Sequence, residues 1–280
     1  MEIKMTNPLI QAYRKPVLYI ALPSGGKYYT TKPKLSVDGE LAIYSMTARD
    51  ELVSKTPDAL FNGEATFSLI QSCAPDIGNP TEMPVNDLVV ILIAIRMATY
   101  GDAIDVDVKC PECDNMNQLT VSTNALLGSV KENVALDKVT LDNKFVIKVK
   151  PYNLHDRTKL QIQRLKQQKL IQNLADAELS DEQRQKQFGE TFLEIADLTV
   201  TLIANAIIQV KPPEGDTVED EHLILEWLKS ITKEDYDKIR ETVEELSESG
   251  VDTKFDAECI ECKHTWNTNI DLDIANFFAG

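Results

Sequence analysis

The chain has 280 residues, of which 43% are hydrophobic, so it is long enough to bury a substantial core in one large domain or two smaller ones. Its 45 acidic and 29 basic residues give a net charge of −16, which argues against a general attraction to the phosphates of nucleic acids. The most hydrophobic stretch, Leu88–Ile95, has only eight residues, whereas a helix that crosses a bilayer needs roughly 20. The first residues also contain no apolar run of signal-peptide length, so we expect neither a membrane-spanning segment nor an export signal.

The first predicted elements are extended. Residues 14–44 are rich in β-branched and aromatic side chains, and they contain two turn signals, Pro23-Ser24-Gly25-Gly26 and Asp38-Gly39. We therefore expect a small antiparallel sheet. The glycines of "SGGK" do not form a phosphate loop, because Ala21 and Tyr28 stand where that motif requires glycine and Ser or Thr. Gly25 and Gly26 are instead interpreted as turn residues that permit positive φ.

Three helices are predicted next. Thr47 is placed to cap the first one, with Asp50 as its partner in a capping box. Pro57 suits the first turn of the second helix. Pro84 and Gly101 are placed to start and end the third, which is apolar nearly all round. We expect this third helix in the middle of a helical cluster.

A cysteine pair then interrupts a strand-like pattern. Apolar residues alternate with acids over Ile104–Val108, and the alternation resumes at Leu119 after Cys110 and Cys113. This order predicts a strand, a cysteine knuckle and a second strand. A further strand pair is expected within 134–152, with Asp142-Asn143 as its turn.

The next hundred residues are predicted to be mostly helical. One helix over 153–177 carries a basic side from Arg157 to Lys169, and a second runs from a cap at Ser180 to Val210. Two short acidic helices are expected at about 218–230 and 233–249.

A second cysteine pair supplies the ligands that the first one lacks. Cys259 and Cys262 repeat the arrangement of Cys110 and Cys113, again between strand-like segments. Two such knuckles are typical of a zinc ribbon, in which four thiolates bind Zn²⁺ tetrahedrally. About 145 residues separate the two pairs, far more than the usual gap of roughly 15–20. If both pairs bind one ion, the helical segment is an insertion between the halves of the ribbon.

Other interpretations of the cysteines remain open. Either pair can be a redox dithiol, although no βαβ pattern of the thioredoxin type surrounds them. His264 can replace one thiolate as a ligand. Four cysteines fill the zinc shell, whereas catalytic zinc keeps an open position, so a structural ion is favoured. No enzyme motif is present, and we expect neither catalysis nor a small-molecule substrate.

Four blocks of the chain stand out together: "LPSGGKYY", "LAIYSMTARDELVSKTPDALFNGEATFSLIQSCAPDI", "DLVVILIAIRMATYGD" and the tail "LDIANFF". These blocks resemble the baseplate hub proteins of T-even-type contractile-tailed bacteriophages. The resemblance covers roughly residues 15–115 and the last 25. It implies a non-enzymatic protein of the virion tail baseplate, assembled in the host cytoplasm, whose partners are other hub and tail proteins.

Together these patterns predict an α+β chain in three parts. They are a β-hairpin and helical region over 1–101, a split zinc-ribbon unit formed by 102–150 and 250–280, and a helical insertion over 151–249. Gly25, Gly26, Phe277 and Phe278 are candidate partner-binding residues, although the two aromatic residues can equally pack into the protein's own core.

The alternative function is a zinc-ribbon protein that binds nucleic acid or takes part in transcription. The ribbon itself and the basic side from Arg157 to Lys169 support it. The acids around both knuckles argue against it, because they would repel phosphate. Within the hub interpretation, a permanent subunit and a transient assembly factor both remain open.

Overall fold

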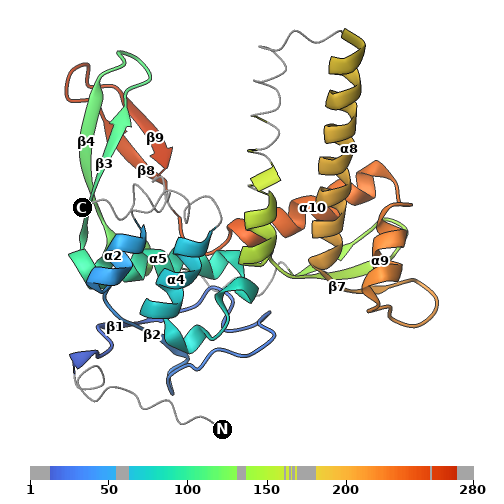
Figure 1. Cartoon of the computed structure of the whole chain (residues 1–280), viewed down its shortest axis with the longest axis horizontal. Coiled ribbons are helices and arrows are strands. Elements are labelled where there is room, and N and C mark those ends of the chain that lie inside the picture. Colours follow the sequence, from blue (N-terminus) through green and yellow to red (C-terminus); the bar gives the residue numbers. More distant parts are fainter. Residues whose placement is uncertain are drawn as a thin grey trace. The chain divides into compact units, whose positions relative to one another are not determined.

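The computed structural model describes residues 13–54, 63–130, 137–160, 162–163, 165, 168, 181–252 and 254–269. Helices and small antiparallel sheets alternate along the chain, which confirms the predicted α+β class (Figure 1). The elements up to residue 130 are β1 (Leu18–Ala21), β2 (Glu40–Ile43), α2 (Ala48–Ser54), α4 (Glu64–Cys73), the 3-10 helices η1 (Pro75–Ile77) and η2 (Pro80–Glu82), α5 (Val85–Tyr100), β3 (Ala103–Lys109), β4 (Met116–Ser122) and α6 (Thr123–Gly128). The later elements are β5 (Lys138–Thr140), β6 (Val146–Val149), α8 (Asp181–Asn205), β7 (Ile207–Lys211), α9 (Glu221–Leu228), α10 (Lys233–Glu248), β8 (Lys254–Glu258) and β9 (Thr265–Asn269).

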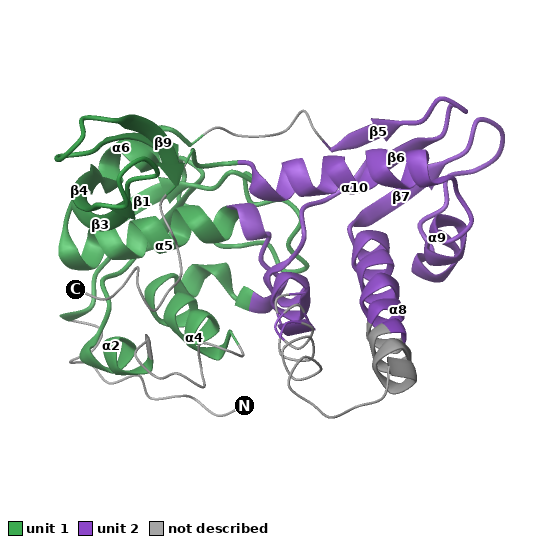
Figure 2. Cartoon of the chain, turned by 90° about the horizontal axis from the view of Figure 1, so that it is seen from above, with its two compact units in different colours: residues 1–80, 87–132, 250–280 green, residues 81–86, 133–249 purple. Residues whose placement is uncertain are grey.

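The chain divides into two compact units (Figure 2). Unit 1 consists of residues 1–80, 87–132 and 250–280, and unit 2 consists of residues 81–86 and 133–249. The sequence predicts a division with different boundaries, in which residues 102–150 belong to the ribbon unit. In the structure, strands β5 and β6 from this range form a sheet with β7 inside unit 2.

The predicted N-terminal sheet is present in unit 1. Strands β1 and β2 pair antiparallel, from Leu18 opposite Ile43 to Ala21 opposite Glu40. The Asp38-Gly39 signal marks a tight turn directly before β2, closed by a 3.0 Å bond from Gly39 N–H to the Ser36 carbonyl. The partner of β2 is β1, which ends at Ala21, so the turn at Asp38-Gly39 does not join the two strands of this sheet.

The helices of unit 1 begin and end largely where the sequence indicates. Asp50 N–H donates to Thr47 Oγ1 (3.3 Å) and Thr47 N–H donates to Asp50 Oδ2 (2.8 Å), which confirms the capping box. Helix α4 follows Gly63, while the predicted start at Pro57 lies outside the described residues. Helix α5 ends at Tyr100, and Gly101, with a φ of 91°, terminates it as predicted. The central residues of α5 are buried, as expected.

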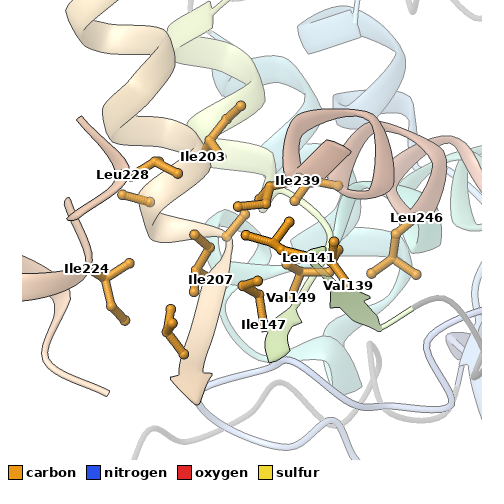
Figure 3. Packing of buried hydrophobic residues seen from close by; sticks show 14 residues of the cluster. Val139, Leu141, Ile147, Val149, Ile203, Ile207, Ile224, Leu228, Ile239 and Leu246 are labelled. Atoms are coloured by element: carbon orange, nitrogen blue, oxygen red, sulfur yellow. The ribbon is translucent and has the colours of Figure 1, made fainter. Parts of the chain in front are cut away.

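Unit 2 packs three helices around a three-stranded sheet with the order β5-β6-β7. Asp142 and Asn143 lie in the predicted turn between β5 and β6. Figure 3 shows side chains from the sheet and from α8, α9 and α10 pointing toward one another. The buried cluster contains Val139, Leu141, Ile147, Val149, Ile203, Ala204, Ala206, Ile207, Val210, Ile224, Leu228, Ile239, Val243 and Leu246.

The prediction of a continuous helix up to Val210 is wrong. Helix α8 ends at Asn205, and residues Ile207–Lys211 form β7, which pairs antiparallel with β6. The β-branched run that starts at Ile207 favours a strand, and the partner strand β6 satisfies its backbone groups. The two acidic helices, by contrast, are confirmed as α9 and α10, capped by Asp220 and Thr232.

Candidate metal centre

Two β-hairpins of unit 1 carry the four paired cysteines. Strands β3 and β4 pair from Ala103 opposite Ser122 to Lys109 opposite Met116, and the first cysteine pair follows β3 at the turn. Strands β8 and β9 pair in the same way and carry the second pair at their own turn. The predicted order of strand, knuckle and strand is therefore present twice.

The first knuckle is a tight turn held by backbone hydrogen bonds. Cys110 N–H donates to the Asn115 carbonyl over 2.9 Å, and Asp114 N–H donates to the Cys110 carbonyl over 3.0 Å. Asp114 adopts a positive φ of 59°, which reverses the chain after Cys113. This turn directs both sulfurs of the pair to the same side.

The second knuckle repeats this geometry. Cys259 N–H donates to the His264 carbonyl over 2.9 Å, and Lys263 N–H donates to the Cys259 carbonyl over 3.1 Å. Lys263 has the same positive φ of 59° as its counterpart in the first knuckle. Two segments far apart in the sequence thus form the same local structure, which indicates a pseudo-symmetric pair of half-sites.

The four sulfurs meet at one place. All of them lie within 4.8 Å of one another, with 3.7 Å between the Sγ atoms of Cys110 and Cys262 and 3.6 Å between those of Cys113 and Cys259. A tetrahedral zinc ion with Zn–S bonds of roughly 2.3 Å requires S–S edges of about 3.8 Å. The cluster therefore has the size of a four-thiolate metal site.

The electrostatics of the cluster favour a bound cation. Backbone N–H groups of Cys262 and Glu261 point at the Cys259 sulfur and lower the pKa of that thiol to about 6. At Cys113 the N–H of Asn115 acts in the same direction, but hydrogen bonding with the neighbouring thiols raises the pKa to about 12. Crowded thiols cannot all ionise without a positive charge among them, and a metal ion supplies that charge when it displaces the protons.

The other candidate ligand lies apart from this cluster. The His264 imidazole stacks on Trp266, with ring centroids 6.1 Å apart and planes within 9°. Among the described residues, the group of side chains that could hold a metal consists of the four cysteines. The fifth cysteine, Cys73, is buried in the core, and burial raises the pKa of its thiol to about 12.

The "SGGK" loop is held by a residue that the sequence did not single out. Asp87 in the first turn of α5 is fully buried and accepts three hydrogen bonds from the loop, two from Ser24 and one from the Tyr29 hydroxyl. Burial raises the pKa of Asp87 to about 6, although these hydrogen bonds oppose the shift. The loop glycines, Gly25 and Gly26, have positive φ, as the sequence predicts. Phe277 and Phe278 lie outside the described residues.

Comparison with known families decides where the chain belongs. The family model described as T4 bacteriophage base plate protein matches residues 16–279. The chain belongs to this family. The resemblance in the sequence blocks is thereby confirmed at the level of a T4-type baseplate protein, and it extends across the segments that those blocks left uncovered. Comparisons with curated proteins and with solved structures gave no match.

Membership of this family identifies a phage baseplate structural protein. It indicates a location in the tail baseplate of a virion and contacts with other phage structural proteins. No helix among the described residues is long and apolar enough to span a membrane.

Proposed function

We propose that this baseplate protein belongs to the central hub, as a structural subunit or as a factor that assembles the hub in the host cytoplasm. The observation that carries the proposal is the family match over residues 16–279, together with the hub-like blocks around "TPDALFNGEA". Its role is to bind other hub and tail proteins, without catalysis and without a small-molecule substrate.

The four-cysteine cluster serves this role as a structural zinc site. Four thiolates complete a tetrahedral shell, so the site leaves no position for substrate or water. The ion would join hairpin β3–β4 to hairpin β8–β9, with about 145 residues between Cys113 and Cys259. Closing so long a loop costs chain entropy, and the free energy of metal binding offsets that cost.

The ribbon surface does not suit nucleic acid. Its exposed side chains include acids on both hairpins, and Lys109 and Lys263 form ion pairs with Asp114 and Glu258. The exposed acids are Asp105, Asp107, Glu112, Asp114, Asp256, Glu258 and Glu261. Such a surface repels phosphates. A DNA titration at low salt tests this point, and measurable binding there would favour the nucleic-acid function instead.

Mass spectrometry of purified particles tests the hub assignment. Peptides of this chain in virions and in isolated hubs would support a permanent subunit. Peptides in hub intermediates from infected cells but not in virions would support an assembly factor. Absence from both, in samples that contain the neighbouring baseplate proteins, would contradict the proposal.

The partner surface is proposed to include the loop at Gly25 and Gly26 and the C-terminal Phe277 and Phe278. Deletion of residues 276–280 tests the second part, with both thermal stability and incorporation into hubs as readouts. Loss of incorporation at unchanged stability supports partner contact. Loss of stability instead assigns the aromatic residues to the protein's own core.

A further inference from the structure

One buried amide links the two cysteine knuckles. Asn117 lies in β4, seven positions after the first cysteine, and its side chain is fully buried. Its Nδ2 donates to the Asn115 carbonyl over 3.0 Å, and its Oδ1 accepts the backbone N–H of Ile260 over 2.9 Å. Ile260 directly follows Cys259 and is 143 positions away in the sequence.

We propose that Asn117 is a positioning residue for the metal centre, which sets the second knuckle in register with the first. This inference rests on the zinc site proposed above. The Asn115 carbonyl that Asn117 binds is the same group that accepts Cys110 N–H, so the amide is fixed to the backbone of the first half-site. Through Ile260 N–H it then holds the peptide next to Cys259.

An amide suits this position because it must donate on one side and accept on the other. A carboxylate would accept from Ile260 but could not donate to the carbonyl of Asn115, and an apolar side chain would do neither. The carboxylate would set a negative charge against the Asn115 carbonyl oxygen, and the apolar side chain would leave the Ile260 N–H without its partner. Groups that orient metal ligands in this way typically change metal affinity 10- to 100-fold when they are removed.

The pseudo-symmetry of the ribbon shows that the link is one-sided. Pro111 occupies the position in the first knuckle that Ile260 occupies in the second, and proline has no N–H to donate. Trp266 stands at the position that corresponds to Asn117. The symmetry-related hydrogen bond therefore cannot form. Within the part of the chain that the structure describes, the hydrogen bond that joins the backbone of one knuckle to the other, apart from the contacts between the sulfurs, is the one from Ile260 N–H to Asn117 Oδ1.

This asymmetry provides a backbone test that leaves Asn117 intact. Ile260→Pro removes the N–H donor, and the knuckle backbone tolerates proline there because Pro111 already occupies the equivalent position. Ile260→Ala keeps the N–H and is the matched control, since the Ile260 side chain is 66% exposed. Asn117→Leu removes the other half of the link. Asn267→Leu is its control, because Asn267 is exposed and bonds Asp256 within one hairpin.

The full-length protein is titrated with Zn²⁺ against a chelating dye, and with Co²⁺ to record the absorption of the metal–thiolate centre. We expect Ile260→Pro and Asn117→Leu each to weaken Zn²⁺ binding 10- to 100-fold and to shift the Co²⁺ bands. The double variant is expected to be no weaker than either single one, because both remove the same link. Ile260→Ala and Asn267→Leu are expected to match the wild type.

The outcomes separate this inference from the zinc proposal. If the wild type binds Zn²⁺, and Ile260→Pro binds it with the same affinity as Ile260→Ala and with an unchanged Co²⁺ spectrum, the role of Asn117 is overturned. The zinc proposal itself then stands. Failure of the wild type itself to bind Zn²⁺ or Co²⁺ overturns both. If Asn117→Leu does not fold, the comparison of Ile260→Pro with Ile260→Ala still decides the matter.

Discussion

Ser24 is bound twice by Asp87: its N–H donates to Oδ1 over 2.8 Å, and its hydroxyl donates to Oδ2 over 2.5 Å. The Tyr29 hydroxyl adds a third bond of 2.7 Å to Oδ2. One buried carboxyl group at the start of α5 thus fixes both ends of the loop over Ser24–Tyr29. Because this loop belongs to a block that resembles hub proteins, its conformation bears directly on the proposed partner surface.

The stability of the protein should depend on the protonation of Asp87. Its pKa is raised to about 6 in the folded state, against about 4 in an unfolded chain. Between these values the folded state binds more protons, so this group makes the protein less stable as pH rises from about 4 to about 6. The difference corresponds to roughly 3 kcal/mol at most. Urea unfolding of wild type and Asp87→Asn across this range isolates the effect, because the amide does not titrate.

The wild type should gain stability relative to Asp87→Asn as the pH falls from 7 to 4.5. Asp87→Ala is the second variant, and it should lose about 2–4 kcal/mol at pH 4.5, since it leaves three loop donors unpaired. Its loss relative to the wild type should be smaller at pH 7, because alanine does not titrate and the buried Asp87 carboxyl group is ionised there. A pH-independent difference between wild type and Asp87→Asn would show that the carboxyl group is not perturbed by burial.

The two loop glycines should respond differently to a methyl group. Both have positive φ, 60° at Gly25 and 73° at Gly26, so alanine costs about 1 kcal/mol at either position. A Cβ on Gly25 meets no atom within 4 Å, whereas one on Gly26 lies 3.2 Å from Leu35 Cδ1. We expect Gly26→Ala to be the more destabilising by about 1 kcal/mol, as measured by urea unfolding. Equal losses would show that Leu35 moves aside freely.

Local sequence patterns predicted those features that depend on a few neighbouring residues. The capping box of Thr47 and Asp50, the end of α5 at Gly101 and the two cysteine knuckles each need only a short stretch of chain. The convergence of the two knuckles was also predictable, because a tetrahedral ion needs four ligands and each pair supplies two.

Features that depend on distant partners were not predictable in this way. The helical spacing of α8 continues to Ala206 in the sequence, and the short β-branched run after it becomes a strand because it pairs with β6. Asp87 and Asn117 are polar residues without a motif, and their importance comes from donors that lie 63 and 143 positions away. No spacing rule reveals such contacts in one sequence.

The core of unit 2 should be sensitive at Ile147, at the centre of its sheet. Ile147 is fully buried in the cluster that joins the sheet to its helices. Ile147→Ala should cost about 3–4 kcal/mol of unfolding free energy, and Ile147→Val about 1 kcal/mol. Leu223→Ala, at an exposed position on α9, should stay within about 0.5 kcal/mol. Chemical denaturation measures all three, and a small loss in Ile147→Ala would contradict the packing of this core.

Removal of the metal should lower the stability of the wild type, because an ion that binds only the folded chain stabilises it by mass action. Elemental analysis should give about one zinc per chain. Cys113→Ser and Cys262→Ser should each abolish the increase in melting temperature that added zinc produces, since each leaves three thiolates. The double variant should show the same absence of a zinc-dependent increase in melting temperature as either single variant, because each single change already removes the site.

Cys73→Ala controls for the loss of a cysteine as such. Cys73 is buried away from the cluster, so this change should lower the melting temperature through lost packing while it keeps the zinc-dependent increase. A wild type whose melting temperature and zinc content do not change on chelation would contradict a structural ion. The four cysteines would then act as thiols, and disulfide mapping after mild oxidation should link Cys110 to Cys262 and Cys113 to Cys259, whose sulfurs lie 3.7 and 3.6 Å apart.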